Sequence, residues 1–314
     1  MRNPDRYGPW ALVTGASNGI GKALATRIAG EGINVVLVAR SVDTLHTLAA
    51  ELTASFGVET MVLPADLAVP GAAGDVACLT DRIDIGLVIL AAGFGNTGTF
   101  LETQLAEELQ LVAVNITTVT QLTHAFAGRL AARGKGGIVL FGSIVGWQGV
   151  PGQANYAASK AYVQSLAEGL HDELAPRGVD VLAVAPGPVD SGCGARAGPT
   201  MTSATSPDVV AVGIDPAHRF TVTVIPGARG KVLTAALTPL PRRIRSLILG
   251  RVIAGMRGAH LSSVWEPADP LVRNSSESRS SGSRGERCPS RPTMSVLTTK
   301  ALSTASSTLC TTAV

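Results

Sequence analysis

The sequence predicts an α/β fold, a single domain built on a doubly wound parallel sheet with helices on both faces. Short β-rich runs alternate with longer segments of helical spacing, and several of the runs are apolar on both faces. The 35 glycines suit the tight turns of such a fold, and 46% hydrophobic against 16% charged residues exclude a wholly disordered chain. We expect ligands to bind beyond the carboxyl ends of the strands.

The predicted elements follow one another in order from Trp10. Strands are expected at 10–14, 34–39, 58–63, 85–90, 136–141 and 179–185, with a candidate seventh at 220–226. Segments 21–30, 43–55 and 102–133 carry apolar residues at helical intervals between them. Right-handed crossovers between parallel strands then give the doubly wound arrangement.

The ends of the chain differ from this pattern. Residues 1–9 form an N-terminal arm, 10–264 the predicted domain, and 190–207 a long loop rich in Gly, Ser, Thr and Pro that we expect to border a substrate. The basic amphipathic stretch 241–258 either lies on a membrane surface or closes the core as a last helix, which we favour. The Ser/Thr-rich tail, 265–314, is expected to be disordered.

Composition excludes several classes of protein. A formal charge of +3, with basic residues scattered rather than interleaved with aromatics, does not indicate a nucleic-acid surface. The cysteines lie far apart without a C-x-x-C pair, so we expect neither a metal site nor a disulfide framework, and a reduced, cytoplasmic compartment fits best. The chain shows no apolar signal-peptide region and no apolar run long enough for a membrane span.

A glycine-rich loop follows the first predicted strand and opens a helical pattern. Gly15 permits a tight turn, Gly19 lets the backbone approach a pyrophosphate, and Gly21 lets helix and strand pack closely. The N-terminus of the helix would supply N–H donors to the anion. Glycine turns that bind nothing are common, so this loop alone is weak support for a dinucleotide site.

The residues after the next three strands would complete that site. Arg40, followed by Ser41, offers a planar cation where an acidic residue would bind the ribose hydroxyl of NAD, so NADP(H) is favoured over NAD(H). The alternative is that Arg40 is a solvated charge at a strand end. Asp66, beside Leu67, would accept from the adenine amino group, and the small residues of 91–93 would let the cofactor lie against the backbone.

Three polar residues form the most specific pattern. Ser143 follows the fifth strand, and Tyr156 and Lys160 are four residues apart, so on a helix they share a face. A nearby ammonium stabilises a phenolate, which makes a phenol of reference pKa about 10 a usable acid and base. Ser143 would hydrogen-bond the substrate oxygen within reach of Tyr156. Alone, a Tyr-x-x-x-Lys pair is ordinary helix surface, but its place after the strand-end serine and the glycine loop makes coincidence improbable.

Taken together, TGASNGIG, AAG at 91–93, YAASK and PGPV at 186–189 make the sequence resemble the short-chain dehydrogenase/reductase family over residues 10–256. The resemblance implies a Rossmann-like domain and adds Asn115 to Ser143, Tyr156 and Lys160 as a fourth catalytic residue, which holds a proton-relay water. The implied cofactor-binding set is Gly15, Ser17, Asn18, Gly19, Ile20, Arg40, Ser41, Asp66, Leu67, Ala91, Ala92, Gly93, Tyr156, Lys160, Pro186, Gly187 and Val189.

The function implied by the resemblance is NADP(H)-dependent hydride transfer between the nicotinamide and a small-molecule carbonyl compound or secondary alcohol. The apolar character of 146–152 and of the last helix favours a lipophilic substrate. No metal is needed, and a homo-oligomer is implied. One departure is Leu90, where the family usually has asparagine. The competing hypothesis is a non-enzymatic NADP-binding sensor or interaction module on the same fold.

Overall fold

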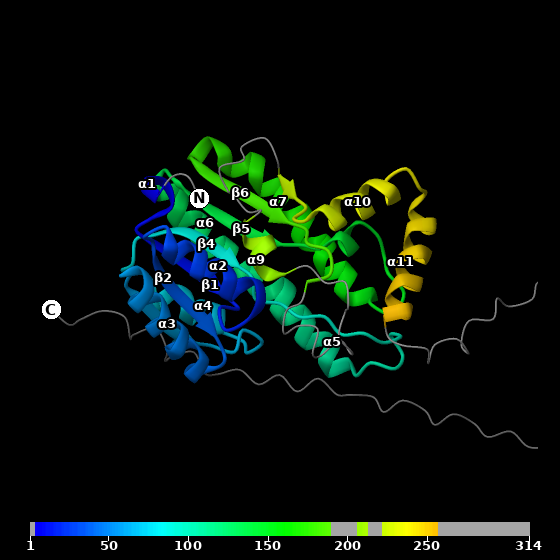
Figure 1. Cartoon of the computed structure of the whole chain (residues 1–314), viewed down its shortest axis with the longest axis horizontal. Helices are drawn as coiled ribbons and strands as arrows, with labels where there is room; N and C mark the ends of the chain where they lie inside the picture. The colour runs from blue at the N-terminus through cyan, green and yellow to red at the C-terminus, as the bar shows by residue number, and fades with distance from the viewer. Residues whose placement is uncertain (1–3, 190–205, 213–221, 257–314) are drawn as a thin grey trace, which may run out of the picture. The chain divides into compact units, whose positions relative to one another are not determined.

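The computed structural model describes residues 4–189, 206–212 and 222–256, all within one unit, Met1–Trp265 (Figure 1). Most of the predicted substrate loop and the whole predicted tail lie outside the described residues. The described part contains a seven-stranded parallel sheet of order β3-β2-β1-β4-β5-β6-β7. Its strands are β1 (Trp10–Thr14), β2 (Asn34–Ala39), β3 (Thr60–Pro64), β4 (Ile85–Leu90), β5 (Gly136–Phe141), β6 (Val179–Val184) and β7 (Thr223–Val224).

The strand order places a switch point between β1 and β4. The chain proceeds outward from β1 through β2 to β3, and then returns to pair β4 against the other side of β1. The loops that leave β1 and β4 therefore diverge, and a crevice opens between them at the carboxyl edge of the sheet. The sheet predicted from sequence is confirmed. The third strand begins two residues later than expected, and the seventh is only two residues long.

Helices cover both faces of the sheet, as predicted. One core cluster joins the sheet to α2, α3 and α9, and the other joins it to α4, α6 and α7. Strands such as β4 and β5 are buried along their whole length because both faces are covered. The helices of these layers are α2 (Gly19–Gly30), α3 (Val42–Phe56), α4 (Ala72–Leu79), α6 (Val119–Arg133), α7 (Ala154–Leu174) and α9 (Pro207–Val212).

The segment 102–133 is not one regular helix. It divides into α5 (Leu105–Val112), a π-helical stretch η1 (Ala113–Thr118), and then α6. The spacing of apolar residues does not distinguish a π-helical turn from the slightly tighter turn of an α-helix. The sequence therefore predicted only a helical segment. The π-helical stretch contains Asn115, and π-bulges frequently mark functional sites.

The last two described helices pack beside the loop that follows β5. They are α10 (Ala228–Leu237) and α11 (Arg242–Met256), and the loop contains a short 3-10 helix, η2 (Ile144–Trp147). Leu249 of α11 is buried in an apolar cluster with Ile144 and Val145. The last helix therefore contributes to the core, which is the arrangement that the sequence favoured over a membrane-surface helix. No described helix is long and apolar enough to span a bilayer.

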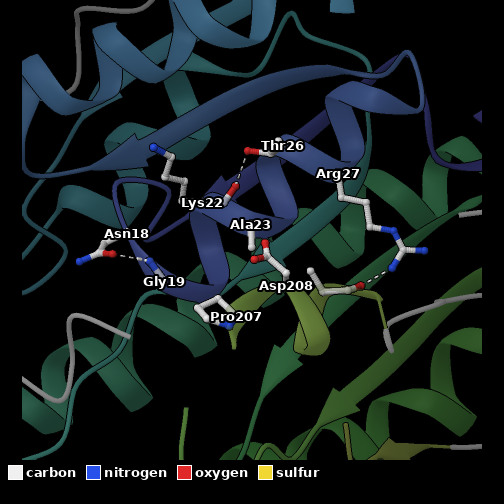
Figure 2. Close-up of a pocket in the computed structure, with 9 residues that line it drawn as sticks. Asn18, Gly19, Lys22, Ala23, Thr26, Arg27, Pro207 and Asp208 are labelled. Atoms are coloured by element: carbon white, nitrogen blue, oxygen red, sulfur yellow. Dashed lines mark hydrogen bonds between the residues drawn. The ribbon is translucent and has the colours of Figure 1, made fainter. Parts of the chain in front are cut away.

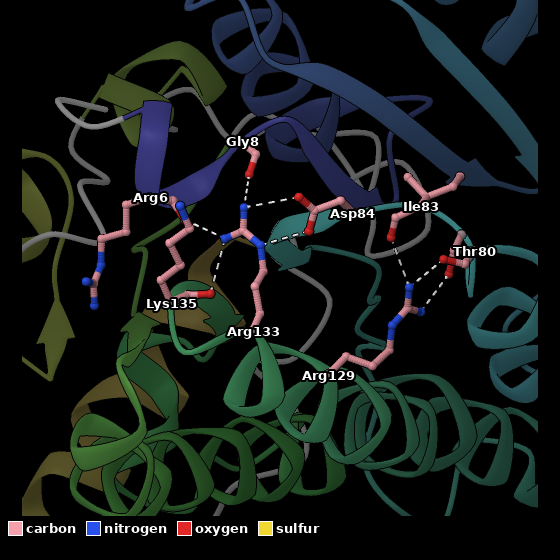
Figure 3. Close-up of polar contacts among 8 residues, drawn as sticks. All are labelled: Arg6, Gly8, Thr80, Ile83, Asp84, Arg129, Arg133 and Lys135. Carbon is pink, nitrogen blue, oxygen red and sulfur yellow. Dashed lines mark hydrogen bonds and ion pairs between the residues drawn. The ribbon is translucent and has the colours of Figure 1, made fainter.

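Arginines fix the N-terminal arm and the loops at the amino edge of the sheet (Figure 3). Arg133 donates to the carbonyls of Arg6 and Gly8 and forms an ion pair of 2.8 Å with Asp84. The short helix α1 (Pro4–Tyr7) is held further by Asp180, whose carboxylate accepts from the Tyr7 hydroxyl. Burial, together with that hydrogen bond, raises the pKa of Tyr7 above its ordinary value.

Replacing Arg129 with methionine is expected to lower the free energy of unfolding by about 2–3 kcal/mol. Its guanidinium donates to the carbonyls of Thr80 and Ile83 at the end of α4, and Arg129→Met leaves these acceptors without their charged partner. Thermal unfolding monitored by circular dichroism measures the loss, about 4–12 °C for a domain of this size. The exposed Arg82→Met is the control and should change stability by less than about 0.5 kcal/mol. An equal loss in both variants would contradict this role.

Candidate active site

A cavity of about 330 Å³ lies at the switch point between β1 and β4. It receives residues from the loops that follow β1, β2, β3 and β4, so the carboxyl edge of the sheet supplies nearly all of its wall. The predicted cofactor residues that line it are Gly15, Ser17, Asn18, Gly19, Ile20, Arg40, Ser41, Asp66, Leu67, Ala91, Ala92 and Gly93.

The glycine loop presents the N-terminus of α2 to this cavity. Asn18 caps the helix in an extended conformation, and its side-chain oxygen accepts from the Gly19 N–H at 2.7 Å. Gly19 has a φ of 55°, and a Cβ at Gly21 would collide with the carbonyl of Gly15. These two positions therefore require glycine, and the remaining first-turn N–H groups can serve an anion such as a pyrophosphate.

The charged residues of this cavity lie at the ends of β2 and β3. Arg40 is exposed, and the neighbouring Ser41 hydroxyl hydrogen-bonds Thr44 within α3. The Asp66 carboxylate accepts from the backbone N–H of Ala68 at 3.1 Å, which fixes its turn. The cavity lining therefore includes a cation, a carboxylate and a helix N-terminus, which fits a phosphorylated dinucleotide.

The wall also contains residues that the sequence analysis missed. Some adjoin predicted residues at strand ends, where adjacency to the motif was an available signal. Others come from α5 and η1, which only the tertiary fold brings to this edge. The missed residues are Ala39, Ala65, Ala68, Phe94, Gln110 and Val114.

Tyr156 and Lys160 lie one turn apart on α7, and the ammonium of Lys160 is 5.6 Å from the centre of the Tyr156 ring. Lys160 is only 7% exposed, and its Nζ donates to the carbonyl of Phe141 at 2.9 Å. The loop after β4 approaches both residues. A Cβ at Gly93 would lie 3.4 Å from the lysine Nζ, and one at Gly95 would lie 3.0 Å from the tyrosine ring.

Asn115 connects this loop to α7. Its side-chain oxygen accepts from the Phe94 N–H at 3.1 Å, and its Nδ2 donates to the Phe94 carbonyl at 2.9 Å. The same Nδ2 lies 3.1 Å from the hydroxyl of Ser159, which is adjacent to Lys160 in sequence. Asn115 therefore fixes the loop of Gly93 against the helix that carries Tyr156 and Lys160.

Ser143 begins η2 and lies against the turn that follows β6. Its Oγ accepts from the Val145 N–H and donates to the carbonyl of Pro186, both at 3.4 Å. That carbonyl also accepts from the Ile144 N–H at 3.2 Å. The structure thus joins Ser143 to the predicted turn at Pro186 and Gly187, while Val189 packs on the core cluster of α2 and α3.

A buried carboxylate that the sequence analysis did not identify supports this arrangement. Glu108 of α5 is 7% exposed, and its two oxygens accept from Asn96 at 2.7 Å and from Asn155 at 2.6 Å. Asn96 belongs to the loop after β4, and Asn155 immediately precedes Tyr156. Glu108 is therefore a bridge between that loop and the first turn of α7.

A separate pocket of about 400 Å³ lies between α2 and α9 (Figure 2). Thr26 and Arg27, which line it, are hydrogen-bonded to the carbonyls of Lys22 and Ala211, and Lys22 forms an ion pair with Glu51. Its main polar side chains are thus engaged within the protein. The pocket indicates how α9 packs beside the glycine loop rather than where a ligand binds.

The family model described as short chain dehydrogenase matches residues 9–201. A 7beta-hydroxysteroid dehydrogenase of Clostridium sardiniense is 36% identical over 187 residues, which cover 60% of this chain and 72% of that protein.

Two further matches extend the comparison. A very-long-chain 3-oxoacyl-CoA reductase of Podospora anserina is 38% identical over 186 residues, covering 58% of this chain and 55% of that longer protein. A solved short-chain dehydrogenase from Sphingobium yanoikuyae, in complex with NADPH, is 34% identical with a TM-score of 0.67. That alignment covers 74% of this chain and 94% of the solved chain.

Proposed function

The chain belongs to the short-chain dehydrogenase family, and on that premise we propose that it interconverts a lipophilic ketone and the corresponding secondary alcohol with NADP(H). As a member of the family it is an oxidoreductase that uses a nicotinamide cofactor. The observation that carries the proposal is the buried ammonium of Lys160, 5.6 Å from the ring of Tyr156, at the same edge of the sheet as the glycine loop.

Different residues of the cavity would bind different parts of the cofactor. The N-terminus of α2 at Gly19 would receive the pyrophosphate, and Arg40 would bind the phosphate that distinguishes NADP from NAD. Asp66 would accept from the adenine amino group. The NADPH in the related Sphingobium yanoikuyae enzyme supports the preference for NADP(H). A bound nicotinamide supplies the hydride for reduction or accepts it in oxidation.

The chain's own residues then handle the substrate oxygen and its proton. In reduction the Tyr156 hydroxyl donates its proton to the oxygen, and in oxidation the phenolate takes a proton back. Lys160 stabilises the phenolate through its positive charge. Ser143 holds the substrate oxygen by a hydrogen bond, for which it would exchange its long contact to Pro186. Asn115 supports the proton relay by fixing the loop beside Lys160.

An apolar environment around Tyr156 supports a lipophilic substrate. The ring packs against a cluster with Ile144, Leu233, Leu237 and Leu249. The related proteins named for hydroxysteroids and for very-long-chain 3-oxoacyl thioesters point in the same direction. Assembly into a homo-oligomer and a cytoplasmic location stay predictions.

The test is oxidation of NADPH, followed by its absorbance, with a panel of steroid ketones, aryl ketones and a long-chain 3-oxoacyl thioester. We expect turnover of one or more bulky ketones, and faster turnover with NADPH than with NADH. Saturable NADPH binding without turnover of any compound would overturn the proposal and favour the non-enzymatic sensor.

Glu108→Gln is expected to lower kcat about tenfold and to leave the KM for NADPH within about twofold. The amide replaces one of the two acceptor oxygens with a donor, so the bridge to Asn96 or Asn155 is lost and Tyr156 is held less firmly. Steady-state kinetics measures the two constants. The exposed neighbour Glu107→Gln is the matched control. A rise in KM with kcat unchanged would contradict the positioning role.

A further inference from the structure

A third cavity, of about 290 Å³, lies between η2 and the helices α10 and α11. One of its lining residues is Ile144, which follows Ser143 in the sequence. The apolar lining residues belong to the same cluster as the ring of Tyr156. The cavity is therefore next to the proposed reaction centre but separate from the cofactor cavity. Its lining residues are Ile144, Trp147, Gln148, Leu233, Thr234, Leu237, Thr238, Arg245 and Leu249.

Two polar atoms of this wall are buried without a hydrogen-bond partner among the described residues. They are the hydroxyl oxygen of Thr234 and the Nε of Arg245. Two other polar lining side chains are engaged, since Gln148 donates to the Ile144 carbonyl at 3.3 Å and Thr238 donates to the Thr234 carbonyl at 2.7 Å. A buried polar atom left unpaired is costly, so Thr234 and Arg245 require explanation.

The charge of Arg245 adds to that requirement. None of the described residues that line the cavity is acidic, and none of the ion pairs among the described residues includes Arg245. The buried Nε–H of Arg245 is well satisfied by a planar oxyanion, because the N–H groups of a guanidinium match the two oxygens of a carboxylate. The Thr234 hydroxyl, one turn along α10 from Leu237, offers a second donor on the same wall.

We propose that this cavity binds the carboxylate end of the substrate, with Arg245 and Thr234 as the residues that select it. The proposal rests on the function proposed above, and it narrows the substrate to an apolar ketone or alcohol that carries a carboxylate away from the reacting carbon. The leucines of α10 and α11 cover the apolar body, while the carbonyl end lies towards Ser143 and Tyr156. Apolar walls strengthen the pairing because they exclude water from it.

The test compares an oxo-steroid that carries a side-chain carboxylate with the methyl ester of the same compound. Binding of each to the NADP-saturated full-length protein is measured by calorimetry, which needs no turnover. For the wild type we expect the acid to bind at least about tenfold more tightly than the ester. Arg245→Gln should weaken binding of the acid about ten- to a hundredfold and change binding of the ester less than about twofold. The exposed Arg243→Gln on the same helix is the matched control.

Several outcomes would overturn the inference. Equal binding of acid and ester by the wild type, no binding of the acid, or the same loss in the Arg243 variant would each do so. Thr234→Val is a second variant, and it retains the charge of Arg245. It should weaken binding of the acid but not binding of the ester. Turnover of both probes with no effect of Arg245 would leave the proposed function standing. Arg245-dependent binding of the acid without turnover of either probe would support the carboxylate site and contradict the proposed function.

Discussion

Tyr156→Phe is expected to lower kcat about 10²–10⁴-fold while leaving the affinity for NADPH nearly unchanged. The substitution removes the hydroxyl that we propose exchanges a proton with the substrate oxygen, but it keeps the ring that packs against Gly95 and the apolar cluster. Because the aromatic volume is retained, the fold and the cavity should persist. Single-turnover kinetics with NADPH and an accepted ketone measures the proton-dependent step, and fluorescence of bound NADPH measures affinity.

Tyr162→Phe is the matched control for this experiment. Tyr162 lies on the same helix, is 38% exposed, and its hydroxyl hydrogen-bonds Thr120 at 2.8 Å, away from Lys160. Removing that hydroxyl should leave kcat within about twofold, since it is an exposed hydrogen bond. A Tyr156→Phe variant that retains the wild-type rate would show that another group transfers the proton.

The sequence predicted those parts of the fold that depend on short-range patterns. Apolar runs bounded by turns defined the strands, and the spacing of Tyr156 and Lys160 placed them on one face of a helix. The diverging loops at Gly15 and Ala91 then followed from the topology of parallel sheets. Continuous apolar runs therefore carried the information for the strands, and a spacing of about 3.6 residues carried it for the helices.

The rest depends on contacts between residues far apart in the chain. Nothing near Glu108 in the sequence indicates that its oxygens will bind Asn96 and Asn155, since these hydrogen bonds form only when α5 packs against α7 and against the loop after β4. Arg245 likewise appeared as one of several basic residues in an amphipathic stretch. Its Nε is buried beside Thr234 in the cavity wall only because α10 and α11 fold over η2. A pairwise contact of this kind has no local signature.

Stability and chemistry are also divided between the two edges of the sheet, which a motif search does not reveal. The arginine contacts of α6 lie at the amino ends of the strands, whereas Ser143 and the glycine loop lie at the carboxyl ends. Arg129→Met should therefore lower the melting temperature and leave kcat unchanged at temperatures where the protein is folded. Loss of kcat in proportion to stability would contradict this separation.

Arg40→Asp is expected to lower kcat/KM with NADPH on the order of a hundredfold and to reverse the cofactor preference towards NADH. Among the described residues that line the cavity between β1 and β4, Arg40 is the one that carries a positive charge. In the proposed complex its loss would remove a charge-assisted hydrogen bond to the ribose phosphate, and the new carboxylate would repel that phosphate. With NADH the same carboxylate can accept a hydrogen bond from the ribose hydroxyl. Both effects therefore lower the ratio of kcat/KM with NADPH to kcat/KM with NADH.

Steady-state kinetics with both cofactors and one ketone measures this ratio for the wild type, Arg40→Gln and Arg40→Asp. The neutral variant separates the lost attraction from the added repulsion, and its preference should fall between the other two. The exposed Arg82→Asp, in the turn before β4, is the control for a change in overall charge. Because Asp66 already lines the cavity, the carboxylate that Arg40→Asp adds makes the cavity still less favourable for a phosphate. An unchanged ratio in all three proteins would mean that the phosphate is bound by a cation outside this cavity wall.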